Sequence, residues 1–320
     1  MIILYFFFFF FQVKLHVDDH NVLEFIQKYL GIGRVYVSNN EASFVVTIKE
    51  EIKLIIDIFS ESSLNTTKHL NFLAFKKAFE LYTNKNYLSR EDLNKEINLL
   101  KNSMNSKRSD FEMPNSHQVL ITDYWLLGFV EGEGSFTLVK KKNYSLRFDL
   151  SQSSKDLSLM VEIRNFLNHL ATKWDSSKDY DEVVSLSLIK TPKRLPYDII
   201  NITIKGNFYI TNVLIPFFDS MIWLTKKELD YKDWKVVLKL RQLGLHYTSE
   251  GVKILEQISS QMNNSRLSSA ATTQKGKHSA VDRTILQKDI ERLLTAPSKC
   301  LPPLFSPSSS LEWVEEEKEN

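Results

Sequence analysis

Apolar and polar residues alternate with a period of two in several short stretches of the chain, and each stretch predicts a half-buried strand. Every second residue is polar in residues 11–17. Residues 34–37 and 43–48 are two further strand-like runs on either side of a turn at residues 39–40, which predicts a hairpin. The first part of the chain is therefore expected to form a small antiparallel sheet.

Segments with helical periodicity lie between and after these strands. Residues 22–30 predict a short helix that is closed by Gly31 and Gly33. Residues 50–59 predict an amphipathic helix, and another helix is expected to end near Tyr82. Helices and strands mixed in this order indicate an α+β fold.

The order of these elements repeats in the second half of the chain. Three pairs of segments match in pattern, at offsets that grow from 135 to 156 and then 159 residues: 11–16 with 146–151, 45–49 with 201–205, and 66–75 with 225–234. The growing offset predicts an insertion, which we assign to the polar stretch 171–196. The chain is thus expected to contain two related halves.

The repeat divides the chain into four expected parts. They are a first repeat at 1–83, a linker with one helix at 84–118, a second repeat at 119–266, and a partly disordered C-terminal extension at 267–320. Within the linker, Ser89 followed by two acids predicts the start of a helix over residues 91–104. Residues 281–294 predict one more helix in the extension, with disorder from Thr295 onward.

Residues 124–136 form the stretch around which the second repeat is organised. Three of the nine glycines, Gly128, Gly132 and Gly134, lie within seven residues of one another in an otherwise apolar helical segment. Gly128 and Gly132 stand four apart, so they share one helix face and allow a second helix to approach closely. We expect the helix to stop at Gly134.

Two carboxylates accompany these glycines. Glu131 and Glu133 are two residues apart and so point to roughly opposite sides of the predicted helix. Glu133 falls at the C-terminus of the helix, where the macrodipole disfavours an anion by about 0.3–1 kcal/mol. Glu133 is therefore expected to meet a compensating cation.

Composition excludes several other classes of protein. One cysteine, Cys300, in 320 residues rules out a disulfide framework and a cysteine-based zinc cluster, and the seven histidines make no metal-binding pattern. The apolar residues 1–10 are too few to span a bilayer. The net charge is +2, but residues 311–320 hold five Glu and one Lys and contribute −4, so the remainder carries +6. This mild excess of positive charge is compatible with a nucleic-acid partner.

The nine residues Leu-Leu-Gly-Phe-Val-Glu-Gly-Glu-Gly at 126–134 resemble the LAGLIDADG motif of intron-encoded homing endonucleases. Further stretches resemble the double-motif proteins of fungal mitochondrial introns, at residues 31–36, 64–68, 75–82 and 229–234. The resemblance covers roughly residues 11–262. It implies two pseudo-symmetric αββαββα repeats, whose antiparallel sheets form a saddle on DNA.

The repeat offset bears on the first copy of this motif. Subtracting 135 from Glu133 gives −2, so the first motif helix would lie just upstream of Met1, and the first repeat is expected to be N-terminally truncated. Apolar side chains of the remaining motif helix, such as Leu126 and Leu127, are then expected to be exposed. We also expect the chain before about Val22 to be loosely ordered and residues 121–262 to form the stable unit.

The resemblance assigns roles to individual residues. Glu133, with Gly132, falls on the metal site, which implies Mg²⁺ or another divalent cation. Lys227 and its repeat-equivalent Lys68 would neutralise charge on the scissile phosphate, and Gln152 would position water. The polar sheet faces would contact DNA, and the expected residues are Gln12, Lys14, His16, Arg34, Tyr36, Thr137, Val139, Lys141, Arg147, Asp149, Ser151, Asn201, Thr203 and Lys205.

The function implied is a site-specific DNA endonuclease that cuts at an intron insertion site in mitochondria. Its expected partner is double-stranded DNA; it is expected to be a monomer and to have no membrane contact. With one motif acid, the chain alone is expected to cut poorly or to nick one strand. Two alternatives remain at this point: an RNA maturase that helps its host group I intron to fold, and an inactive remnant.

Overall fold

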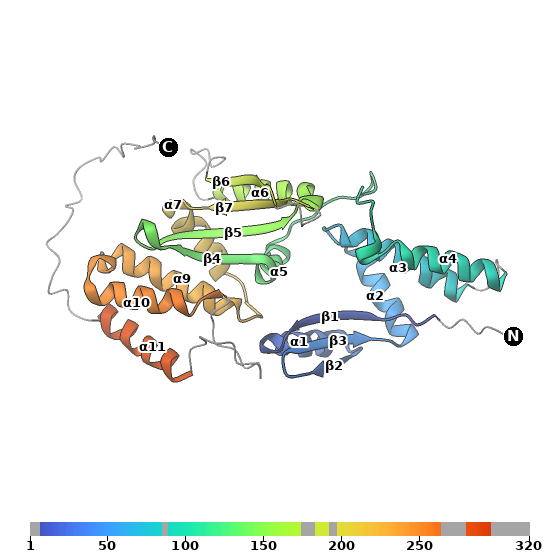
Figure 1. Cartoon of the computed structure of the whole chain (residues 1–320), viewed down its shortest axis with the longest axis horizontal. Helices are drawn as coiled ribbons and strands as arrows, with labels where there is room; N and C mark the ends of the chain where they lie inside the picture. Colours follow the sequence, from blue (N-terminus) through green and yellow to red (C-terminus); the bar gives the residue numbers. More distant parts are fainter. Residues whose placement is uncertain (1–6, 85–88, 174–182, 192–196, 264–279, 296–320) are drawn as a thin grey trace.

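The computed structural model describes residues 7–84, 89–173, 183–191, 197–263 and 280–295. It contains two antiparallel sheets in separate halves of the molecule, joined through a long helical linker (Figure 1). The expected mixture of helices and strands is therefore confirmed. The predictions for the first six residues, for much of the stretch 171–196 and for the tail beyond Thr295 fall outside the described residues.

The first half forms a three-stranded sheet in the order β1-β3-β2. Its elements are β1 Phe11–His16, α1 His20–Leu30, β2 Arg34–Val37, β3 Glu41–Val46, α2 Lys49–Glu61 and α3 Lys68–Thr83. Leu23 of α1, Phe44 of β3 and Ile52 of α2 are completely buried and form the centre of its core. Apolar residues alternate along β3 because one face of the sheet lies against the helices.

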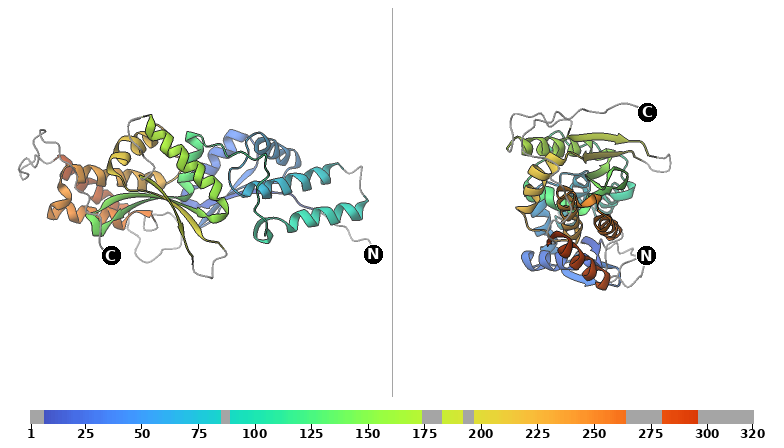
Figure 2. Two further views of the ribbon diagram at one scale, coloured as in Figure 1. Left: turned by 90° about the horizontal axis from the view of Figure 1, so that it is seen from above. Right: turned by 90° about the vertical axis from the view of Figure 1, so that its left-hand side faces the viewer.

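The second half forms a four-stranded sheet in the order β4-β5-β7-β6. Its elements are α5 Asp123–Glu133, β4 Gly134–Val139, β5 Ser145–Ser153, α6 Leu157–Thr172, β6 Val184–Ile189, β7 Ile199–Ile204, α7 Asn207–Tyr209, η5 Ile210–Leu214, α8 Ile215–Asp219 and α9 Lys227–Gln242. This sheet curves under its helices when it is seen from above (Figure 2).

The two sheets correspond strand by strand. The order β1-β3-β2 matches β5-β7-β6, with helices in equivalent positions, so the internal repeat is visible in the topology. Among the described residues, the first half holds no counterpart of α5 and β4. Strand β6 lies inside the stretch that we interpreted as an insertion, and it is the counterpart of β2, so that interpretation is wrong for residues 184–189.

A helical hairpin and an extended segment join the halves. Helix α4, Arg90–Asn102, packs against α3 and projects to one side of the molecule (Figure 1). The chain then returns along the start of α3, where Asn65 exchanges two hydrogen bonds with the backbone of Leu120, at 2.7 and 3.0 Å. The segment just before α5 is therefore fastened to the first half.

The expected exposure of apolar residues on α5 is wrong. Leu126 and Leu127 are 1% and 2% exposed, because both pack into the core of the second half. The ring of Phe9 lies edge-on against those of Phe75 and Phe79 on α3, within the core of the first half. Strand β1 pairs with β3 over its whole length, so the first sheet includes it.

The C-terminal part of the described chain adds two helices, α10 Ser249–Ser260 and α11 Ala280–Thr295. The predicted helix in the extension is thus confirmed. Arg283 of α11 makes two hydrogen bonds to the carboxylate of Asp233 on α9, at 2.8 and 2.5 Å. Burial raises the pKa of Asp233, and Arg283 acts against that shift. Among the described residues, we find no helix with the length and apolar character of a membrane span.

Candidate functional site

The two ends of helix α5 are well defined, and they fix the position of its last residue, Glu133. The Thr122 hydroxyl accepts the backbone N–H of Trp125 at 3.2 Å, so Thr122 caps the helix and Asp123 is its first residue. The helix ends at Glu133, as predicted. A Cβ atom at Gly134 would lie 2.7 Å from the Val130 carbonyl oxygen, so only glycine fits where β4 turns away from the helix.

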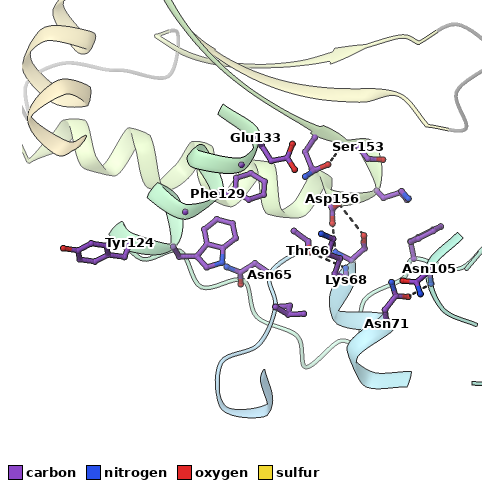
Figure 3. A pocket seen from close by; sticks show the side chains of 18 residues that line it. Asn65, Thr66, Lys68, Asn71, Asn105, Tyr124, Phe129, Glu133, Ser153 and Asp156 are labelled. Carbon is purple, nitrogen blue, oxygen red and sulfur yellow. Dashed lines mark hydrogen bonds between the residues drawn. The ribbon is translucent and has the colours of Figure 1, made fainter. Parts of the chain in front are cut away.

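A groove of about 700 Å³ runs along one face of α5, between that helix, the end of β5 and the start of α3 (Figure 3). The stacked rings of Trp125 and Phe129, with centroids 5.0 Å apart, form part of its wall. Gly128 and Gly132 also line it, and a Cβ atom on either would meet nothing within 4 Å. The bare helix face predicted from the glycine spacing therefore borders open space.

Glu133 is exposed in this groove (Figure 3). Within the described parts of the chain, its carboxylate has no ion pair or hydrogen bond, so the expected compensating cation does not come from a side chain placed there. Gln152 of β5 and Lys68 at the start of α3 line the same groove. Lys227 donates a hydrogen bond from Nζ to the Gly134 carbonyl oxygen at 2.8 Å, one residue beyond Glu133.

Glu131 does not line this groove, which agrees with the predicted divergence of its side chain from that of Glu133. Its Oε1 accepts the backbone N–H groups of Leu224 and Thr225, both at 2.7 Å. These residues lie just before α9, so Glu131 ties α5 to the segment that leads to Lys227. Sequence reasoning missed this contact because its partners are more than ninety residues away.

One face of the first sheet carries the predicted DNA-contacting residues. Gln12, Lys14 and His16 of β1 are exposed, and so are Arg34 and Tyr36 of β2. The strand register aligns Gln12 with Arg34 across β3 and aligns Lys14 with Tyr36. These exposed side chains therefore stand in two pairs on either side of β3, with the half-buried Val45 and Ser43 between them.

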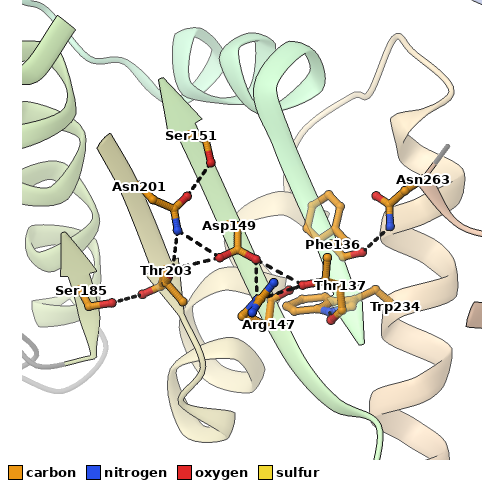
Figure 4. A network of polar contacts seen from close by, with 10 residues as sticks. All are labelled: Phe136, Thr137, Arg147, Asp149, Ser151, Ser185, Asn201, Thr203, Trp234 and Asn263. Carbon is orange, nitrogen blue, oxygen red and sulfur yellow. Dashed lines mark hydrogen bonds and ion pairs between the residues drawn. The ribbon is translucent and has the colours of Figure 1, made fainter. Parts of the chain in front are cut away.

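The second sheet carries a connected polar network on the corresponding face (Figure 4). Asp149 accepts hydrogen bonds from Arg147 Nε at 2.6 Å, Thr137 Oγ1 at 3.2 Å and Thr203 Oγ1 at 2.9 Å. Asn201 joins the network through bonds with Ser151 and Thr203. The side chain of Arg147 is 39% exposed, whereas that of Asp149 is only 14% exposed.

This network changes the interpretation of two predicted DNA contacts. Asn201 and Thr203 are 8% and 9% exposed, since both lie under neighbouring side chains of the sheet. They therefore fit a supporting role better than direct contact with a base. The other predicted residues lie at the margin of the sheet: Val139 at the end of β4, Lys141 in the turn after it, and Lys205 exposed beyond β7.

Two related antiparallel sheets, with a glycine-containing helix that carries an exposed acid between them, define a pseudo-symmetric α+β fold class. The profile of the family described as LAGLIDADG endonuclease matches residues 5–79 and 126–238. The chain therefore belongs to the LAGLIDADG endonuclease family.

Several known proteins are similar to this chain. Probable intron-encoded endonuclease 3 of Neurospora crassa is 30% identical over 76% of this chain and 46% of its own length. The mitochondrial protein RF1 of Saccharomyces cerevisiae is 28% identical over 79% of this chain and 54% of its own length. The chain thus spans about half the length of these relatives.

Solved structures agree with the fold. The LAGLIDADG homing endonuclease I-GzeII in complex with its DNA target aligns with a TM-score of 0.66 and 28% identity, over 81% of this chain and 89% of that one. I-SmaMI bound to cleaved DNA aligns with a TM-score of 0.65 and 25% identity, over 81% and 87% of the two chains.

Proposed function

We propose that this chain is a site-specific endonuclease of the homing type, which binds double-stranded DNA as a monomer and cuts it at an intron insertion site in mitochondria. Membership of the family supports this, as does the similarity to a probable intron-encoded endonuclease, to a mitochondrial protein and to DNA-bound homing endonucleases. The observation that carries the proposal is the exposed carboxylate of Glu133, unpaired among the described residues, in the groove between α5, the end of β5 and the start of α3.

The donor atoms at the end of α5 fit a magnesium ion. Mg²⁺ prefers oxygen ligands, keeps several waters, and is usually held by one or two carboxylates together with substrate phosphate. Glu133 supplies one carboxylate, and the Gly132 carbonyl lies in the last turn of the helix, where carbonyl groups lack intrahelical partners. A bound divalent cation would supply an activated water and stabilise the leaving oxygen.

The surrounding side chains would hold the phosphate and the water. The ammonium group of Lys227 donates to the carbonyl of Gly134, the residue after Glu133. Lys68 brings a second positive charge into the groove. Both would stabilise negative charge that develops on the phosphate. The amide of Gln152, which faces the same groove, would orient water for in-line attack.

The two polar sheet faces would read the DNA target. A two-stranded ribbon fits the major groove, and Arg commonly makes a bidentate contact with guanine. Arg147 suits this role because its Nε donates to Asp149 at 2.6 Å, while its two terminal nitrogens make no hydrogen bond or ion pair within the described residues. On the first sheet, the exposed side chains of Gln12 and Arg34 would contact base edges in the same way.

Replacing Arg147 by alanine is expected to relax the preference for one base pair of the target. The loss of a bidentate contact corresponds to about 1–3 kcal/mol of discrimination, or about 5–150-fold in relative affinity. Binding to a library with each target position randomised would measure it. Lys95→Ala, an exposed change on α4 away from both sheets, should leave the profile unaltered. An unchanged profile for Arg147→Ala would exclude this residue from base recognition.

Purified protein of these 320 residues, incubated with Mg²⁺ and DNA that carries the intronless target, is expected to nick one strand faster than the other. The reason is that the described residues supply one acid, and each strand needs its own activated water. Strand-specific end labels on a denaturing gel would separate the two rates. DNA in which the intron splits the target is the control and should stay intact. Efficient cleavage of both strands would show that one motif acid suffices, and no cleavage at all would contradict the proposed function.

A further inference from the structure

Strand β1 of the first half and its counterpart β5 of the second half end in the same way. After β1, the 3-10 turn Val17–Asp19 leads into α1, and after β5, the turn Ser154–Asp156 leads into α6. Asp19 and Asp156 occupy the N-cap positions of α1 and α6. Neither side chain caps its own helix, although capping is the common role of aspartate at that position.

Both carboxylates instead cross to the other half. Asp156 Oδ1 accepts the backbone N–H of Thr67 at 2.6 Å, and its Oδ2 lies 3.4 Å from the hydroxyl of the same residue (Figure 3). Asp19 Oδ1 accepts the backbone N–H of Lys226 at 2.7 Å. The neighbouring Asp18 adds an ion pair with the Lys226 ammonium at 3.5 Å.

These two contacts are equivalent under the internal repeat. Thr67 and Lys226 are the residues immediately before α3 and α9, and neither caps its helix with its own side chain. They stand 159 residues apart, which is the offset at which these segments match in sequence. The same contact is made from the second half to the first and from the first half to the second, which fits a shared role better than chance.

The residues that follow are Lys68 and Lys227, the first residues of α3 and α9. We propose that Asp19 and Asp156 are positioning residues, each of which fixes the lysine of the opposite half: Asp156 positions Lys68 and Asp19 positions Lys227. This inference rests on the proposed nuclease function, in which the two lysines stabilise charge on the scissile phosphate. Each half would thereby depend on the other for the cleavage of one DNA strand.

The physical basis is a charge-assisted hydrogen bond in a buried place. Asp156 is 7% exposed, so water competes poorly for its carboxylate. Without it, the N–H of Thr67 loses its partner, and the first turn of α3 frays or shifts. A displacement of about 1 Å at a reacting group can cost about 100-fold in rate.

Strand-resolved nicking rates test the pairing. For each strand that the protein cuts, Lys68→Ala and Lys227→Ala identify the lysine on which that strand depends. We expect Asp156→Ala to slow the Lys68-dependent strand about 10–100-fold and Asp19→Ala to slow the Lys227-dependent strand similarly, with the other strand near the wild-type rate. Asp156→Asn should restore most of the rate, because its amide oxygen still accepts the N–H bond. Ser89→Ala removes a cap of α4 that serves its own helix and should change neither strand.

Amide hydrogen exchange without DNA separates this inference from the proposed function. Asp156→Ala should speed exchange at the start of α3, in the other half, and Asp19→Ala at the start of α9. If each substitution speeds exchange in the opposite half but the wild-type protein does not cleave DNA, the anchoring role stands and the nuclease role is refuted. Equal slowing of both strands by either variant, or exchange that rises only in the half that carries the substitution, would overturn the positioning role.

Discussion

Glu133→Gln is expected to slow DNA cleavage by about 100–1000-fold while target affinity stays within a few-fold of the wild type. Glutamine keeps the size of the side chain but removes the only charge that α5 contributes to the groove. Loss of one preorganised charge-stabilising group at a reacting centre costs that order of magnitude in other enzymes. Most of the affinity for DNA would come from the sheet faces, which the change does not touch.

Single-turnover cleavage and gel-shift titration, both with Mg²⁺, would measure the two quantities. Glu162→Gln is the matched control, because Glu162 is an exposed acid on α6, outside the groove. A Glu133→Gln protein that cuts at the wild-type rate would remove Glu133 from the metal site. One that fails to bind the target would assign Glu133 to DNA binding instead of cleavage.

Trp234→Ala is expected to destabilise the protein by about 3–5 kcal/mol, a large part of the ~5–15 kcal/mol stability of a typical domain. Trp234 is completely buried, and its ring lies 5.3 Å from that of Phe136. Its indole N–H donates to the Thr137 carbonyl oxygen at 3.2 Å. The substitution would therefore leave a cavity and an unpaired acceptor where α9 packs on β4.

Urea denaturation, followed by far-UV circular dichroism, would measure the loss as a lower midpoint with an unchanged slope. Trp125→Ala is the control, because Trp125 is only partly buried and borders the open groove. Its removal should cost clearly less than that of Trp234. A smaller effect at Trp234 than at Trp125 would show that the second-half core is not the principal source of stability.

The helix of the motif illustrates what could be predicted from sequence. Its end at Gly134, the shared face of Gly128 and Gly132, and the divergence of Glu131 from Glu133 all follow from 3.6-residue periodicity and from the conformational freedom of glycine. The repeat was predictable for a related reason. Matching strands and helices need matching patterns of apolar residues, and such patterns are visible along the chain.

Errors arose where the outcome depended on packing between distant segments. Leu126 and Leu127 were expected to be exposed because one neighbour of α5 was missing from the pattern, but the helix has another apolar face that packs on its own sheet. Strand β6 was taken for an insertion, since its alternating serines look polar until β7 pairs with it. Asn201 and Thr203 lie on the predicted face, and neighbouring side chains cover them.

Sequence by itself determined the local elements of this protein and the acid at the end of the motif helix, because each depends on residues a few positions apart. It also determined the repeat, because the same local patterns return in the second half of the chain. Tertiary structure alone decided which residues share the groove with that acid and which carboxylates reach the residues just before Lys68 and Lys227. Asp156 accepts a hydrogen bond from Thr67, 89 residues away in the sequence, and Asp19 accepts one from Lys226, 207 residues away. The periodicity of the sequence does not predict such a contact, because the two partners come together only when the two halves pack. A carboxylate that this packing removes from water then needs a hydrogen-bond donor.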